Sequence, residues 1–181
     1  MIYITYFVHG TTTDNEQGIS SGWYNVSLSE LGIVQSLDLK NTIRTKHFDI
    51  VFCSDFKRAI DSAHLTFWDR GIEILADNRL RECNYGIYNA QASEIVEPLQ
   101  ETKIQEKFEE WESYEEVKTR ISDFLDFLKE NYKDKSIAIV GHKAPQLALE
   151  VLLNGKTWKQ AFGEDWRKKW TWKPGWEYIV K

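Results

Sequence analysis

Two short apolar runs, each ending at a histidine, constrain the fold of this sequence more than any other feature. Residues 2–8 are apolar, β-branched or aromatic and contain no proline, and His9 and Gly10 follow directly. Residues 136–141 repeat this form near the other end of the chain and lead into His142. Such runs are typical of buried strands, and the carboxyl ends of strands in an open α/β sheet face the crevice where ligands bind. We therefore expect both histidines at one polar pocket.

The remaining strands and helices alternate along the chain. Strands are predicted at residues 48–53, 72–75 and 137–140, with a late edge strand at 176–180. Alternating apolar strands and amphipathic helices predict an α/β fold in three layers (α/β/α) with a mostly parallel central sheet. The chain contains no repeat or linker, so we predict one domain over residues 1–181, with a small cap within 88–112 where a charged stretch, 95–111, favours a helix.

Several helix boundaries are marked by local sequence signals. Ser27 with Glu30, and Ser113 with Glu116, have the spacing of capping boxes. Ser54 and Asp55 are predicted to cap a helix over residues 56–68, and Pro145 and Gly155 bracket the last long helix. Apolar positions at helical spacing are Leu31, Val34, Leu37 and Leu39; Ala59, Ile60, Ala63 and Phe67; and Val117, Ile121, Phe124, Leu125 and Leu128.

Composition excludes several classes of function. The 23 basic residues against 28 acidic ones give a net charge of −5, which argues against general binding of nucleic acid or membrane surfaces. No signal peptide, spanning apolar run or metal-ligand spacing is visible, and Cys53 and Cys83 are expected to be free thiols. We therefore predict a cytoplasmic protein without a metal or other cofactor.

The last part of the chain is rich in tryptophan. Five of the eight tryptophans lie there, and packing of large aromatic side chains is the default interpretation. An aromatic wall for the substrate is the alternative. The five are Trp158, Trp166, Trp170, Trp172 and Trp176.

Four polar side chains are expected at or just after strand ends, and together they suit the handling of a phosphoryl group. Arg offers a fork of donors for phosphate oxygens. A neutral imidazole can attack phosphorus, and a carboxylic acid can protonate the leaving oxygen. The four candidates are His9, Arg58, Glu82 and His142.

These stretches resemble the histidine phosphatase superfamily, also described as phosphoglycerate mutase-like. The resemblance runs in the family's order over residues 1–153 and leaves out the tryptophan-rich tail. It implies that His9 becomes a phosphohistidine, that Arg58 and His142 hold the phosphoryl oxygens with Asn15, and that Glu82 protonates the leaving group. It also implies that no metal is needed. The matching stretches are 7–15, 22–35, 48–63, 80–86, 111–117 and 138–142.

Two positions depart from the pattern of the family. Val8 stands where the family has an Arg before the nucleophilic His, and loss of such a donor could cost about 2–4 kcal/mol of transition-state stabilisation. Lys143 stands where Gly is common, and we hypothesise that it restores part of the missing charge at the phosphate. The alternative for Lys143 is a side chain that faces solvent. Arg79 and Arg81 are expected to be solvated or packed rather than catalytic.

The leading prediction is a phosphomonoester hydrolase acting on small phosphorylated metabolites. A mutase is less favoured because the chain between Glu82 and His142 offers little material for an enclosing cap. Val8 motivates another alternative, a catalytically weak protein that binds phospho-ligands or regulates through them. A protein–protein adaptor is a third, if the tryptophan-rich tail exposes a large apolar patch.

Overall fold

The computed structural model describes residues 1–109, 111–169 and 175–181, with the side chains of 168 and 169 left out of the description. Five strands form one sheet in the order β4-β3-β6-β1-β7. Four of them are parallel, and β7 pairs antiparallel with β1 at the edge. The mostly parallel sheet and the late edge strand are thus confirmed. The strands are β1 (Ile2–Val8), β3 (Ile50–Cys53), β4 (Ile74–Ala76), β6 (Ser136–Gly141) and β7 (Trp176–Val180).

Alternation along the central strands builds two apolar cores, one on each face of the sheet. Ile4 and Tyr6 of β1 belong to one cluster of buried residues, whereas Phe7 belongs to the other. Phe52 and Val51 of β3 divide in the same way. Because successive strand residues point to opposite faces, a continuous apolar run is the pattern that a strand covered on both sides requires.

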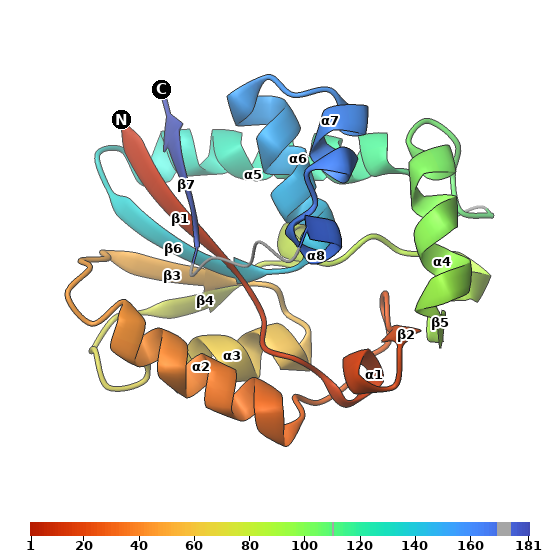
Figure 1. Ribbon diagram of the computed structural model, residues 1–181. Helices are drawn as coiled ribbons and strands as arrows, with labels where there is room; N and C mark the ends of the chain where they lie inside the picture. The colour runs from red at the N-terminus through yellow and green to blue at the C-terminus, as the bar shows by residue number, and fades with distance from the viewer. Residues whose placement is uncertain (110, 170–174) are drawn as a thin grey trace.

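Helices cover both faces of this sheet (Figure 1). On one side lie α2 (Glu30–Thr42) and α3 (Lys57–Phe67), and on the other α5 (Tyr114–Asn131) and α6 (Lys143–Asn154). α7 (Trp158–Gly163) and α8 (Trp166–Lys169) follow next to α6. The predicted apolar stripe of α5 is entirely buried, its capping box of Ser113 and Glu116 is present, and Gly155 ends α6 at φ 66°. The predicted three layers are confirmed.

Two predicted helix starts are wrong. The N-cap of α2 is Ser29, whose Oγ accepts from Gly32 N, because Ser27 and Leu28 are held extended against residues 12 and 13. α3 begins after Phe56 without a side-chain cap. A capping box needs a chain that is free to enter the helix, and here neighbouring segments hold that chain.

Most of the predicted apolar stripe of α2 faces solvent, and only Leu39 of its four residues packs against the core. Leu31, Val34 and Leu37 are 40–52% exposed, whereas Gly32 and Ser36 are the buried residues of the helix. The backbone that follows β1 passes directly over Gly32, where a Cβ would lie 2.0 Å from Thr11 O. Close approach therefore decides which face of α2 turns inward, and apolar content does not.

The segment beyond the carboxyl ends of the strands is less helical than predicted. Its helix α4 (Ser93–Gln100) continues only as a 3₁₀ turn, Glu101–Lys103, and residues 104–109 are not helical. A two-stranded sheet of β2 (Ile19–Ser20) and β5 (Gln91–Ala92) joins it to the loop after α1 (Thr13–Glu16). The single domain and its cap within 88–112 stay predictions.

The smaller features predicted for the chain have mixed outcomes. Cys53 and Cys83 are free and buried, as expected. No helix in the described ranges combines the length and the apolar character that crossing a membrane would require. Trp158 and Trp176 are buried and pack in the core, whereas Trp170 and Trp172 lie outside the described residues. The described tryptophans of the tail therefore offer no large exposed patch for an adaptor.

Candidate active site

The sheet brings His9 and His142 side by side. β1 and β6 are parallel neighbours in which Val8 pairs with Gly141, so both histidines follow directly at the same edge. The backbone N–H of His9 donates to Gly141 O at 3.0 Å. The ring centroids lie 5.0 Å apart with the planes at 64°. Strand register thus sets the distance between the two imidazoles.

His9 is held as a neutral imidazole with one nitrogen available. Nδ1 lies 2.7 Å from Gly10 O, and because a carbonyl only accepts, this contact assigns the proton to Nδ1 and leaves Nε2 unprotonated. Burial, and after it the positive charge of Arg58, lowers the pKa of His9 to about 3. The ring can therefore act as a nucleophile across the physiological pH range.

The backbone of the loop after His9 is anchored on α2 and α3. Gly10 N donates to Ser62 Oγ at 2.9 Å, and a Cβ on Gly10 would lie 2.4 Å from Gly32 O. Only glycine permits this approach. Sequence reasoning missed Ser62, although its position one helical turn after Arg58 could have indicated a residue facing the same site.

Arg58 supplies a buried positive charge from the first turn of α3. Its guanidinium donates to Gly22 O at 2.7 Å and to Tyr24 O at 2.8 Å, and the residue is 2% exposed. Burial lowers its pKa to about 10, so it remains a cation at neutral pH. These two contacts occupy two of the five N–H donors of a guanidinium.

His142 is a buried side chain with unused hydrogen-bonding capacity. Its backbone is fixed by Tyr6, whose hydroxyl accepts from His142 N and donates to His142 O, both at 2.8 Å. Both ring nitrogens are buried, and neither has a hydrogen-bond partner within the described ranges. Burial, Arg58 and His9 all lower the pKa of His142. Leaving a buried polar group unpaired costs about 1–3 kcal/mol, and an oxygen of a bound anion would relieve that cost.

Glu82 is clamped by backbone donors. Its Oε1 accepts from Cys83 N at 2.8 Å and from Ala144 N at 3.0 Å, so it is tied to the first turn of α6 beside His142. Its main-chain oxygen accepts from Trp23 Nε1 and Arg120 Nη2. With Oε1 occupied, Oε2 is the oxygen that can exchange a proton with a bound molecule.

Asn15 lies in α1, in the loop that follows His9. Its side chain completes a capping box with Thr12, in which Thr12 N donates to Asn15 Oδ1 at 3.1 Å. The side-chain oxygen is therefore engaged, whereas the amide N–H₂ is the part that could donate to an anion.

Lys143 does not occupy the place that we hypothesised. Its Nζ lies 2.9 Å from Asp165 Oδ2 and donates to Gln100 Oε1 at 2.8 Å, with only 6% of the side chain exposed. The alternative of a solvent-facing side chain is wrong as well. Because its charge is taken up by a buried carboxylate, Lys143 offers little compensation for Val8, which packs against the core.

A family model, the histidine phosphatase superfamily (branch 1), matches residues 6–174. This chain belongs to the histidine phosphatase superfamily. Among its curated relatives is the putative phosphoserine phosphatase 2 of Hydrogenobacter thermophilus, 29% identical over 156 residues, or 81% of this chain and 76% of the relative. The adenosylcobalamin/alpha-ribazole phosphatase of Escherichia coli is 26% identical over 147 residues, or 75% and 70% of the two chains.

Solved structures share the fold of this histidine phosphatase. A mycobacterial glucosyl-3-phosphoglycerate phosphatase matches with a TM-score of 0.81 at 20% identity, over 89% of this chain and 86% of that one. Phosphoglycerate mutase from Bacillus anthracis matches with a TM-score of 0.74 at 22% identity, over 85% and 80%. These structures establish the phosphoglycerate mutase-like fold, and the family together with its phosphatase relatives makes this chain a phosphatase.

Arg79 and Arg81 of this histidine phosphatase are packed, as expected. Arg79 pairs with Asp77, and Arg81 pairs with Asp55 and lies 4.7 Å from the centroid of the Trp23 ring. Asp55, predicted as a helix cap, therefore holds a neighbouring loop instead. The described residues contain no group of three or more His, Cys, Asp or Glu side chains placed to hold a metal ion.

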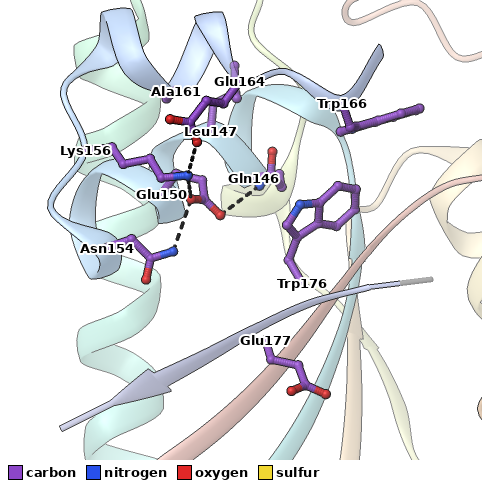
Figure 2. Close-up of a pocket in the computed structure, with 10 residues that line it drawn as sticks. All are labelled: Gln146, Leu147, Glu150, Asn154, Lys156, Ala161, Glu164, Trp166, Trp176 and Glu177. Carbon is purple, nitrogen blue, oxygen red and sulfur yellow. Dashed lines mark hydrogen bonds and ion pairs between the residues drawn. The ribbon is translucent and has the colours of Figure 1, made fainter. Parts of the chain in front are cut away.

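A cavity of about 350 Å³ lies away from the histidines of this phosphatase, among α6, α7, α8 and β7 (Figure 2). Trp166 and Trp176 border it, and Glu150 within it is bound by Lys156, Gln146 and Asn154. His9, Arg58, Glu82 and His142 are not among its lining residues. Trp166 and Trp176 therefore border a separate cavity, and the aromatic wall for the substrate stays a prediction.

Proposed function

We propose that this chain is a metal-independent phosphomonoester hydrolase that acts on small phosphorylated metabolites through a phosphohistidine at His9. The observation that carries the proposal is the arrangement of two histidines. His9 is neutral with Nε2 unprotonated, and its ring centroid lies 5.0 Å from that of His142. The buried ring nitrogens of His142 have no hydrogen-bond partner among the described residues. His9 can act as the nucleophile, and His142 can donate a hydrogen bond to an anion.

In the first step, the lone pair of His9 Nε2 forms a bond to phosphorus while the bond from phosphorus to the ester oxygen breaks. Glu82, protonated on Oε2, gives its proton to the leaving oxygen, which departs as an alcohol. The products of this step are the phosphohistidine and the carboxylate of Glu82. The clamp on Oε1 keeps the carboxyl group beside His142 throughout.

In the second step, a water molecule attacks the same phosphorus. Glu82 takes a proton from that water, the bond from phosphorus to Nε2 breaks, and its electron pair returns to the imidazole. Inorganic phosphate leaves, and both side chains regain their starting protonation. In sum, one ester bond is hydrolysed by one water molecule.

Charge on the transferring group is stabilised by Arg58 and His142, with Asn15 as a further donor. Arg58 is a buried cation whose field reaches both histidines, and fixed donors in a site shielded from water stabilise developing negative charge most strongly. The names of the relatives mention phosphoserine, alpha-ribazole and glucosyl-3-phosphoglycerate. They support a small phosphorylated metabolite as the substrate of this chain.

The test is phosphate release from a generic aryl phosphate without added metal, with native protein and His9→Ala. We expect turnover by the native protein and a loss of at least about 1,000-fold in the variant, with the circular dichroism spectrum unchanged. Incubation with ³²P-labelled substrate followed by an alkaline quench should trap acid-labile label on the native protein alone. Equal rates for the two proteins would contradict the proposal.

Val8 favours a second candidate, a weak enzyme that mainly binds phospho-ligands. The resemblance places an Arg at this position, and Val8 packs its side chain against the core. Tight binding of a phosphate ester without turnover would support this alternative. Exchange of phosphate between two positions of a labelled bisphosphate would instead support a mutase.

A further inference from the structure

The outer wall of the candidate site contains a second arginine, which comes from the tail of the chain. Arg167 lies in α8, and Figure 1 shows this short helix between the first turn of α6 and α4, above the carboxyl ends of β1 and β6. His142 directly precedes α6. The helix α8, which contains Arg167, therefore lies on the side of the sheet opposite α3, which carries Arg58.

The guanidinium of Arg167 is paired at one nitrogen, Nη2, and unpaired at another, Nε, among the described residues. Its Nη2 lies 3.0 Å from Glu97 Oε1 of α4 and 3.4 Å from Asp165 Oδ2. Its Nε is buried and has no hydrogen-bond partner in the described part of the chain. Because the side chain is still 35% exposed, a small molecule can reach the group.

The charge of Arg167 reaches the reaction centre. The positive charge of Arg167 helps to lower the pKa of His9, behind burial and Arg58 in size, and its charge is also felt by the Tyr85 hydroxyl. Tyr85 OH is linked through Gln100 to Lys143, next to His142. Arg58 thus acts more strongly on His9 than Arg167 does.

We propose that Arg167 binds a carboxylate of the substrate, so that the enzyme prefers phosphate monoesters that carry a carboxylate close to the phosphate. This inference rests on the function proposed above. A guanidinium matches a carboxylate with two parallel hydrogen bonds. The carboxylate of Asp165 is paired with Lys143 and also contacts Arg167. Glu97 is 38% exposed and can turn away when a substrate carboxylate takes its place.

The test compares kcat/KM for O-phosphoserine and O-phosphoethanolamine, which differ only in the carboxylate. We expect the native enzyme to prefer O-phosphoserine by about 10- to 100-fold, the range of a charge-assisted contact. Arg167→Gln should bring this ratio close to one, with the larger loss of kcat/KM on O-phosphoserine. Arg167→Lys should retain part of the preference, and Glu97→Gln should retain it fully or increase it by lowering KM for O-phosphoserine.

Arg44→Gln is the matched control, because Arg44 is exposed near the C-terminal end of α2. It should leave the ratio unchanged. An unchanged ratio in Arg167→Gln, or an equal loss on all three substrates, overturns the inference. If the native enzyme hydrolyses the aryl phosphate but does not distinguish the two phosphoamines, the inference alone fails. If it hydrolyses none of them, the proposed function fails and the inference fails with it.

Discussion

The strand-end residues and the wall formed by α4 and α8 are built in different ways, although they face the same site. His9, Glu82 and His142 are positioned mainly by backbone groups: Gly10 O, the N–H groups of Cys83 and Ala144, and the β1–β6 register. The wall depends more on side-chain contacts, above all the ion pairs of Lys143 with Asp165 and of Arg167 with Glu97.

This difference separates two requirements of an enzyme. Chemistry needs groups held within fractions of an ångström, which a sheet and helix termini provide. Recognition of the remainder of a substrate can use side chains at the surface of the fold, where exchanging one residue leaves the sheet intact. The strand ends therefore carry the proposed reaction, and the wall carries the proposed selectivity.

The largest effect is expected from changing Glu82 without moving its carboxyl group. In Glu82→Gln, Oε1 can still accept from Cys83 N and Ala144 N, but the side chain can no longer donate a proton to the leaving oxygen. We expect kcat for an alkyl phosphate to fall by about 100- to 10,000-fold. An aryl phosphate with a good leaving group should lose much less. The measurement is kcat across leaving groups of different pKa, and a loss independent of the leaving group would argue for a purely structural Glu82.

A change in the wall formed by α4 and α8 should lower the free energy of unfolding more than it lowers kcat. Asp165→Asn leaves the buried ammonium of Lys143 without its counter-charge, and breaking a buried pair typically costs about 3–5 kcal/mol. We expect the free energy of unfolding, measured in urea, to fall by that amount, with kcat for the aryl phosphate changed by less than about threefold.

The matched control for the wall is Lys129→Ala, which removes an exposed pair with Asp126. Such pairs contribute about 0–1 kcal/mol. If Asp165→Asn costs no more than this control, the wall is not held together by its ion pairs. If Asp165→Asn abolishes turnover of the aryl phosphate, Lys143 contributes to catalysis, contrary to this expectation.

Burial of His9 should also make the free energy of unfolding depend on pH. Folding keeps His9 neutral down to pH about 3, whereas the unfolded chain protonates it below about pH 6.5. The unfolded state therefore binds more protons, and the free energy of unfolding must fall as the pH drops from about 6.5 toward 3. His9→Asn removes this contribution, so its unfolding free energy should fall less steeply between pH 7 and 4.

Urea unfolding at each pH measures this difference, and the exposed His47 provides the control through His47→Asn. That variant should follow the native curve. Parallel curves for native protein and His9→Asn would show that the imidazole is not kept neutral by the fold.

The smallest effect distinguishes the observed start of α2 from the start that the sequence suggested. Ser29→Ala removes the cap that accepts from Gly32 N and should lower the free energy of unfolding by about 1 kcal/mol. Ser27→Ala changes an exposed side chain and should cost no more than a few tenths. Thermal or urea unfolding of the two variants is the measurement, and a larger cost at Ser27 would reverse the assignment.

Much of the fold could be predicted because burial leaves a local pattern. The runs that form β1, β3 and β6 are apolar on both faces, and the α5 stripe repeats at helical spacing. The apolar residues of α2 also repeat at helical spacing, but the buried residues of that helix are Gly32 and Ser36. The backbone that follows β1 passes directly over Gly32. Close backbone approach has no apolar signature.

The candidate site divides along the same line. Histidines directly after two strands could be placed from the sequence, since the carboxyl ends of parallel strands share one edge of a sheet. The pairing of Lys143 could not, because it depends on which distant residue packs against it. Asp165 lies in the turn before α8, a segment that shows no apolar periodicity.

The sequence by itself determined the order of strands and helices and the residues that end β1 and β6, because these follow from periodicity along a local stretch. Only the tertiary structure decided which charges of the wall meet: Lys143 with Asp165, and Arg167 with Glu97. The physical reason is that a hydrogen bond or ion pair depends on distance in space, and segments far apart in the chain are brought within that distance only when the sheet and its helices have packed.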